Sequence, residues 1–304
     1  MPAGAIWLPA ESPDALPDPG EVGGKAYNLA RLVRAGAPVP PFFVVGARAF
    51  ARVLGDVPVP EDDAAAEAAQ ARALAVEVPP GLRQALGAAL AALGGGPVAV
   101  RSSAVGEDGG RSSFAGQFET VLGVPAHDEA AAWRAVRRVW ASAFHPRALA
   151  YRRERGEGGG AMAVVVQRMV EPAAAGVAFS ADPVTGDRAT AVVSAVYGLG
   201  EGLVSGALDA DTYRVRFGGG GPAVVEAALA RKEQAYRTDP AGGVRVEPVP
   251  GWLAGAPALS DGEVRRIAEA ARALAADFGA EQDVEWALAP GPGGRRVLYL
   301  LQAR

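Results

Sequence analysis

The clearest structural signal in the sequence is QDVEWALAPGPGGRRVLYLLQAR, residues 282–304. Residues 282–289 and 297–304 are rich in apolar and β-branched residues, and a Pro/Gly segment separates them. This pattern predicts two strands that pair across a turn. The pairing would bring Glu285 near Gln302, and Arg304, two residues further along, would lie on the same face as Gln302.

These three side chains form a candidate site for phosphoryl chemistry. Glu285 and Gln302 supply oxygen atoms, the ligand type that Mg²⁺ prefers in proteins. Arg304 supplies a permanent positive charge beside them. Oxygen ligands for Mg²⁺ and a cation on the transferred group are the parts that phosphoryl transfer requires. An ordinary strand end is the alternative interpretation of the same residues.

The lysines form a second signal, because only Lys25 and Lys232 are lysine among the 30 basic Lys and Arg residues. Lys25 lies in GEVGGKAYN, which is not a P-loop, since Pro19 stands where that motif has its first glycine and Ala26 where it has Ser or Thr. A lysine at a helix start can still lie beside a phosphate, where the helix N–H groups add positive potential. A solvated surface lysine is the alternative.

Two further stretches could contact phosphates. VAVRSSA places Arg101 directly after a strand-like run, and a guanidinium at a strand end suits bidentate phosphate binding. A strand-end salt bridge is the alternative there. SSFAGQFET supplies Gly116 and Thr120 in a Gly- and Ser-rich loop whose backbone N–H groups could hold phosphates. GLGEG, residues 198–202, is a weaker signal of the same kind.

Composition excludes several classes of function. The chain has 304 residues, of which 50% are hydrophobic and 21% charged, and a formal net charge of −4. A nucleic-acid partner and a membrane span are therefore not expected. The absence of cysteine excludes disulfides, and with the amino-terminal sequence it favours a cytoplasmic location. The two histidines, His127 and His145, fall in a helical region, so a zinc site or a histidine relay is not expected.

The organisation along the chain is predicted to be α+β, with two halves. The glycine cluster GEGGG, residues 156–160, is the candidate hinge. A buried strand follows it in AMAVVVQRMV, and residues 260–278 form an amphipathic helix with Ser260 as N-cap and Glu263 at the third position.

Taken in order, these stretches and GVAFSADPVTGDR, GLGEGLVSG and DTYRV resemble the amino-terminal nucleotide-binding domain of phosphoenolpyruvate synthases, pyruvate phosphate dikinases and rifampicin phosphotransferases. The resemblance runs from about Gly20 to Arg304. It implies an ATP-grasp fold, in which two α+β subdomains, here 1–160 and 161–304, hold ATP in the cleft between them.

The resemblance also implies roles for individual residues. Lys25 and Arg101 resemble the phosphate-contacting cations, and Gly116 and Thr120 the glycine-rich lid loop. Gln167 matches the position beside adenine and ribose. By the same resemblance Glu285 and Gln302 are Mg²⁺ ligands, and Arg304 steadies the transferred group; these assignments are expectations.

Relatives of this type continue into a swivelling domain with a phosphorylated histidine and a domain that binds the acceptor. Neither follows here, so the sequence predicts a phosphotransferase module that depends on such domains in trans or on another part of the chain. The resemblance leaves two alternatives open. One is a nucleotide-binding regulatory protein without turnover, and the other is an ATP-grasp carboxylate–amine ligase.

Overall fold

The computed structural model of the chain describes residues 5–11, 15–55, 60–105, 118–155 and 161–304, with no side-chain description for 151–155. Contacts between residues group the chain into two compact units. The first unit contains Met1–Arg31, Pro41–Met169 and Pro240–Gly243, and the second contains Leu32–Pro40, Val170–Asp239 and Val244–Arg304.

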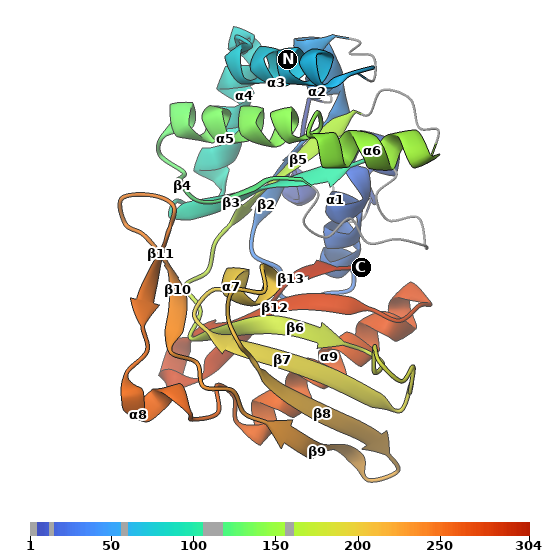
Figure 1. Cartoon of the computed structure of the whole chain (residues 1–304), viewed down its shortest axis with the longest axis vertical. Helices are drawn as coiled ribbons and strands as arrows, with labels where there is room; N and C mark the ends of the chain where they lie inside the picture. The colour runs from blue at the N-terminus through green and yellow to red at the C-terminus, as the bar shows by residue number, and fades with distance from the viewer. Residues whose placement is uncertain (1–4, 12–14, 56–59, 106–117, 156–160) are drawn as a thin grey trace. The chain divides into compact units, whose positions relative to one another are not determined.

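The first unit contains a sheet and the helices around it (Figure 1). Its elements are β1 (Ile6–Trp7), η1 (Pro9–Glu11), α1 (Pro19–Arg34, whose last turn belongs to the second unit), β2 (Phe42–Val45), α2 (Ala47–Leu54), α3 (Asp63–Ala75), α4 (Pro80–Ala92), β3 (Pro97–Ala104), β4 (Thr120–Pro125), α5 (Glu129–Ser142), α6 (Pro146–Arg155) and β5 (Met162–Arg168). Within the described residues the sheet has the order β1-β2-β5-β3-β4, and its neighbouring strands are antiparallel.

The two faces of this sheet differ in chemistry. One face is apolar and packs with α2 to α5 into a core that includes Phe43, Val100, Trp140 and Val166. The opposite face meets the start of α1, where Ser103 of β3 contacts the helix backbone. Alternation along the strands therefore separates a packing face from a face that carries polar side chains.

The second unit contains a larger sheet with one long helix. Its elements are β6 (Ala174–Phe179), β7 (Thr190–Tyr197), α7 (Glu201–Val204), β8 (Asp211–Gly218), β9 (Gly221–Ala228), β10 (Gln234–Thr238), β11 (Val244–Pro248), α8 (Gly251–Ala254), α9 (Asp261–Phe278), β12 (Asp283–Pro290), η2 (Pro292–Gly294) and β13 (Arg296–Ala303). In the described residues its main sheet has the order β13-β12-β6-β7-β8-β9, and β10 pairs with β11 in a separate hairpin.

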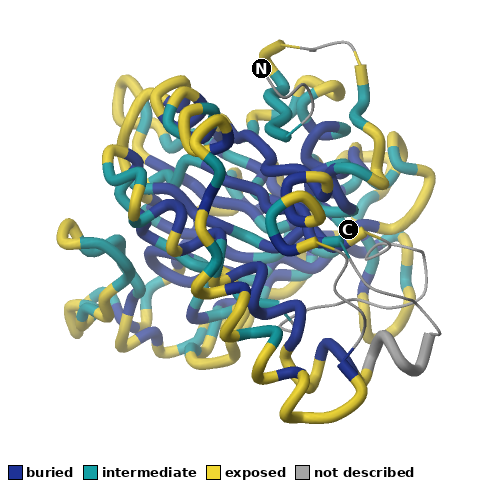
Figure 2. The backbone as a smooth tube through the Cα atoms, turned by 90° about the horizontal axis from the view of Figure 1, so that it is seen from above, coloured by how far each residue is buried: buried dark blue, intermediate teal, exposed yellow. Residues whose placement is uncertain are grey.

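The helix α9 packs against strands of the main sheet through Val264, Ile267 and Leu274. Trp286 and Leu288 of β12 are fully buried as well. Figure 2 colours the backbone by burial, and buried residues such as these are drawn in dark blue. In the described ranges, no helix combines the length and the apolar character that crossing a bilayer demands.

Several local predictions are confirmed. The helix at 261–278 starts with the complete capping box of Ser260 and Glu263, and the two carboxyl-terminal strands pair in the expected sense. The α+β class is confirmed by the antiparallel sheets and their helices. The sequence pattern does not predict the β9 strand or the β10–β11 hairpin.

The boundary between the units differs from the expected division at residue 160. β5 lies after that boundary in the sequence, yet it pairs with β2 and β3 in the sheet of the first unit. The glycine cluster therefore does not mark the boundary between the units, because hydrogen bonds between strands far apart in sequence place β5 in the first unit. The cluster itself, 156–160, and Gly116 of the expected lid loop lie outside the described residues.

Candidate functional site

Lys25 lies just after a break in α1. Gly23 has φ +73° and ψ 171°, which interrupts the helix and lets a new turn begin at Gly24. An L-residue with a side chain rarely adopts this φ, so glycine is required at the break. Lys25 occupies the first turn of the renewed helix and is half-buried, near backbone N–H groups that are not used inside the helix.

Arg101, Thr120 and Gln167 lie on one face of the first sheet. Arg101 is paired with Thr120 of β4 and with Val165 of β5, and Gln167 is paired with Ala99 of β3. Cross-strand partners share a face, as do residues two apart in one strand. The register therefore brings together three of the residues that the sequence analysis singled out, on the face opposite the apolar core.

Gln167 has an unusual environment on this face. Its side chain is 3% exposed, and within the described residues its Nε2 has no hydrogen-bond partner. A buried amide donor without a partner costs about 1–3 kcal/mol, so native proteins rarely keep one without a purpose. An acceptor atom of a bound ligand, such as a ring nitrogen or a hydroxyl of a nucleotide, would satisfy it.

In the second unit, Glu285 is paired directly with Gln302 across β12 and β13, as the sequence analysis predicted. The pairing depends on a bulge, because Trp286 is opposite Leu300 and Leu301 is the additional residue. In an unbroken register, Leu301 would be opposite Glu285. The bulge therefore brings the Gln302 amide to the same side as the Glu285 carboxylate while Leu300 stays buried.

Arg304 is held by Asp283, a residue that the sequence analysis missed. The Arg304 Nε donates a hydrogen bond to a carboxylate oxygen of Asp283 at 2.8 Å, and a second guanidinium nitrogen also lies 2.8 Å from that oxygen. The backbones of the two residues exchange hydrogen bonds of 2.7 and 3.0 Å. Burial raises the pKa of Asp283, and the Arg304 charge opposes this shift. The available signal was spacing, because Asp283 lies two residues before Glu285 on the same strand face.

The donor set at this edge fits Mg²⁺ that shares its coordination with phosphates. Among the residues that the structure describes, there is no group of three or more His, Cys, Asp or Glu side chains suited to a metal ion. Mg²⁺ does not need such a group, because it is commonly bound by one or two carboxylates together with waters and substrate phosphates. Glu285 and Gln302 provide oxygen ligands of the appropriate kind.

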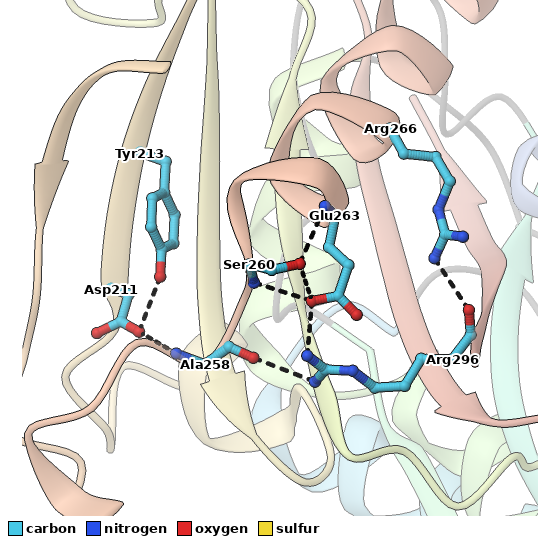
Figure 3. A network of polar contacts seen from close by, with 7 residues as sticks. All are labelled: Asp211, Tyr213, Ala258, Ser260, Glu263, Arg266 and Arg296. Atoms are coloured by element: carbon cyan, nitrogen blue, oxygen red, sulfur yellow. Dashed lines mark hydrogen bonds and ion pairs between the residues drawn. The ribbon is translucent and has the colours of Figure 1, made fainter. Parts of the chain in front are cut away.

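Lys232, the other lysine of the chain, is part of the interior. Its side chain is 1% exposed, and its Nζ lies 2.5 Å from the Asp211 carboxylate and 2.9 Å from the Ala230 carbonyl. Asp211 also accepts hydrogen bonds from Tyr213 and from the Ala258 N–H, as Figure 3 shows. Burial raises the pKa of the Tyr213 hydroxyl, and the Asp211 charge adds to the shift.

This cluster has a structural role. It joins β8 to the segments before β10 and α9, and a contact between Arg296 and Glu263 fastens β13 to the first turn of α9 (Figure 3). The lysine at position 232 therefore has a packing explanation.

The predicted residues thus fall into two sets. Lys25, Arg101, Thr120 and Gln167 belong to the first unit, and Glu285, Gln302 and Arg304 to the second. Gly116 lies outside the described residues.

Comparison with known proteins gives this division of residues a context. Residues 20–304 match the family model described as pyruvate phosphate dikinase, AMP/ATP-binding domain. The chain is 41% identical over 288 residues to a rifampicin phosphotransferase of Streptomyces sp. This alignment covers 88% of this chain and 33% of that protein. The chain is 38% identical over 297 residues to the prodigiosin synthesizing transferase PigC of Serratia marcescens, covering 96% and 32%.

A third relative is the phosphoenolpyruvate synthase of Aeropyrum pernix, 33% identical over 348 aligned residues, covering 98% of this chain and 42% of that protein. The chain therefore spans 33% of the first of these relatives and 42% of the last.

Proposed function

Because the chain belongs to the family of pyruvate phosphate dikinase AMP/ATP-binding domains, we propose that it is the ATP-binding part of a phosphotransferase that passes phosphoryl groups from ATP to a histidine on another domain or chain. The observation that carries the proposal lies on the sheet face opposite the apolar core of the first unit, where the buried amide of Gln167 has no partner among the described residues. The proposal gives that amide a ligand and gives the neighbouring cations a purpose.

In this proposal the first unit binds the nucleotide. Lys25 and Arg101 contact the phosphates, the lysine as a compact charge and the arginine as a planar fork. Thr120, at the start of β4, contacts the phosphates together with Gly116. Gln167 donates a hydrogen bond to the adenosine part of the ligand, which satisfies its buried Nε2.

The second unit supplies the residues that hold Mg²⁺. Glu285 and Gln302 are its protein ligands, and the ion, when bound, neutralises charge on the phosphate oxygens. Arg304 contacts the transferred phosphoryl group. Asp283 keeps the Arg304 side chain in a fixed conformation through its carboxylate, so less conformational entropy is lost when the guanidinium binds its target.

The acceptor is a histidine supplied from outside the residues described here. His127 and His145 are exposed and flank α5, which packs on the apolar face of the sheet, opposite the face that carries Arg101. The length of the relatives supports the presence of further domains, since this chain covers 33% of the first and 42% of the phosphoenolpyruvate synthase.

Titration calorimetry tests the nucleotide and metal parts of the proposal. ATP should bind more weakly without Mg²⁺, and Glu285→Gln should remove most of that metal dependence. Glu247→Gln, on β11, is the matched control and should keep it. ATP affinity that is equal with and without Mg²⁺ in the unmodified protein would contradict the assignment of Glu285 and Gln302.

The reaction products separate this proposal from its alternatives. Transfer of the dikinase type yields AMP and phosphate, whereas a carboxylate–amine ligase yields ADP. A regulatory nucleotide-binding protein yields neither AMP nor ADP above background, even in the presence of a histidine-bearing domain.

A further inference from the structure

The first turn of the renewed helix in α1 has no N-cap side chain of its own. Helix geometry leaves the first N–H groups without intrahelical partners, and a Ser, Thr, Asp or Asn at the N-cap usually accepts one of them. Here Gly23 occupies that position, and it has no side chain. The Ala26 N–H, three residues on, is one of the groups that such a cap would serve.

Ser103, from β3, serves this N–H instead. Its Oγ accepts a hydrogen bond from the Ala26 N–H at 3.0 Å and donates one to the Val22 carbonyl at 2.7 Å. One hydroxyl therefore bridges both sides of the break at Gly23. Ser103 has no exposed surface, so water cannot replace these hydrogen bonds without rearrangement.

The backbone geometry makes this contact specific. A Cβ on Gly23 would lie 2.1 Å from the Ser103 carbonyl oxygen and 2.6 Å from its Oγ. The helix start and the strand thus touch through their backbones, which only glycine at position 23 permits. The position of the turn that carries Lys25 is therefore set by β3.

The same strand carries the other cation. Arg101 lies two residues before Ser103 on the same face of β3, and Lys25 directly precedes Ala26, the residue whose N–H is capped. A single side chain therefore fixes the backbone at Lys25 relative to the strand that presents Arg101. The hydrogen bonds of β3 to β4 and β5 hold Arg101 in place independently.

We propose that Ser103 is a positioning residue that sets the spacing of Lys25 from Arg101 for a polyphosphate ligand. The inference rests on the proposed function, in which these two cations bind the phosphates of ATP. It adds that the lysine acts at full strength only while the hydroxyl of Ser103 caps its turn. Ser103 itself need not touch the ligand.

The test combines binding with backbone dynamics. Ser103→Ala should increase hydrogen exchange at the Ala26 amide and weaken ATP binding by about five- to tenfold, the size expected for a lost cap. Ser103→Cys fills the space with a weaker hydrogen-bonding group, so it should also increase exchange at Ala26 and weaken ATP binding, but by less than Ser103→Ala. The cysteine variant keeps the proposal testable if the alanine variant does not fold.

A double-mutant cycle identifies the route of the effect. Lys25→Ala should weaken ATP binding by itself, and adding Ser103→Ala should then change the affinity by less than twofold. Ser142→Ala is the matched control, because Ser142 is a buried serine of the same unit whose hydroxyl donates to the Val139 carbonyl. This variant should leave ATP affinity unchanged.

The outcomes separate the inference from the proposed function. An equal loss of affinity from Ser103→Ala with and without Lys25 would overturn the positioning role, as would unchanged affinity in both Ser103 variants. Unchanged affinity in Lys25→Ala would instead refute the phosphate role of Lys25 and, with it, the purpose of the positioning. Exchange at Ala26 would still report whether Ser103 forms the cap.

Discussion

Lys25 and Lys232 have opposite environments, although they are the same residue type. Lys25 is half-buried on a helix turn beside a polar sheet face, whereas Lys232 is 1% exposed and paired with the fully buried Asp211. Burial of a charge is tolerated only when it is paired and hydrogen-bonded. The two lysines should therefore affect different properties of the protein.

Removal of the buried charge should destabilise the protein. Lys232→Met leaves the Asp211 carboxylate without its ion pair in the interior, and this should lower the free energy of unfolding by about 3–5 kcal/mol. Lys25→Met is the matched control and should change stability by less than about 1 kcal/mol while weakening ATP binding. Urea denaturation measures the first effect, and equal stability of the two variants would contradict it.

The turn between β6 and β7 should carry an acid-sensitive contribution to stability. Hydrogen bonds, first from the Val184 N–H and then from the Arg214 side chain, lower the pKa of Asp182 from its ordinary value of 3.8 to about 2. A depressed carboxyl pKa stabilises the fold above pH 3.8, and the contribution is lost as the pH falls through about 2.

Asp182→Asn should therefore reduce stability at neutral pH, and the difference from the unmodified protein should shrink between pH 3.8 and about 2. Denaturation curves across this range measure the difference. A constant difference between neutral pH and pH 2 would show that the carboxylate charge is not responsible.

At the scale of elements, α9 shows how a local signal is completed by tertiary contacts. Ser260 and Glu263 form the reciprocal capping box, which the sequence alone predicts. Arg296 of β13 then binds the same Glu263 carboxylate at 2.6 Å. The cap therefore also attaches the helix to the edge of the sheet that carries Gln302 and Arg304.

Two substitutions in the first turn of α9 should act in opposite directions. Ser260→Ala should lower the free energy of unfolding by about 1 kcal/mol, because it removes the cap. Gly262→Ala should raise it by about 0.5–1 kcal/mol, since the added Cβ meets no atom within 4 Å and alanine loses less backbone entropy. Thermal and urea denaturation measure both changes; a destabilising Gly262→Ala would contradict the open space at that position.

At the scale of the whole molecule, the proposed function predicts that ATP turnover depends on an added acceptor histidine. Phosphoryl transfer requires an acceptor held in line with the phosphorus atom, and binding groups alone do not provide one. With labelled ATP and Mg²⁺, the isolated chain should release AMP slowly or not at all. Addition of a histidine-bearing swivelling domain from the same source should produce acid-labile phosphoprotein and AMP.

The control for this experiment is the same swivelling domain with its acceptor histidine replaced by alanine, which should restore no turnover. A phosphohistidine mapped to His127 or His145 would show that the acceptor lies within these 304 residues, and rapid AMP release by the isolated chain would show that turnover needs no added domain.

The sequence by itself determined the family and many of the local elements, although not β9 or the β10–β11 hairpin. The capping box at Ser260, the strand run before Gln167 and the pairing of Glu285 with Gln302 could be predicted, because propensity and turn chemistry act between residues close in sequence. The ordered motifs led to the family that the comparison then confirmed.

Only the tertiary structure decided which residues meet across long separations. Ser103 and Ala26 are 77 residues apart in the sequence, and Lys232 and Asp211 are 21 residues apart, with β9 between them. The bulge at Leu301 likewise depends on how β13 pairs with β12. These contacts follow from strand register and backbone approach, which many residues set together, so no short motif contains the information that specifies them.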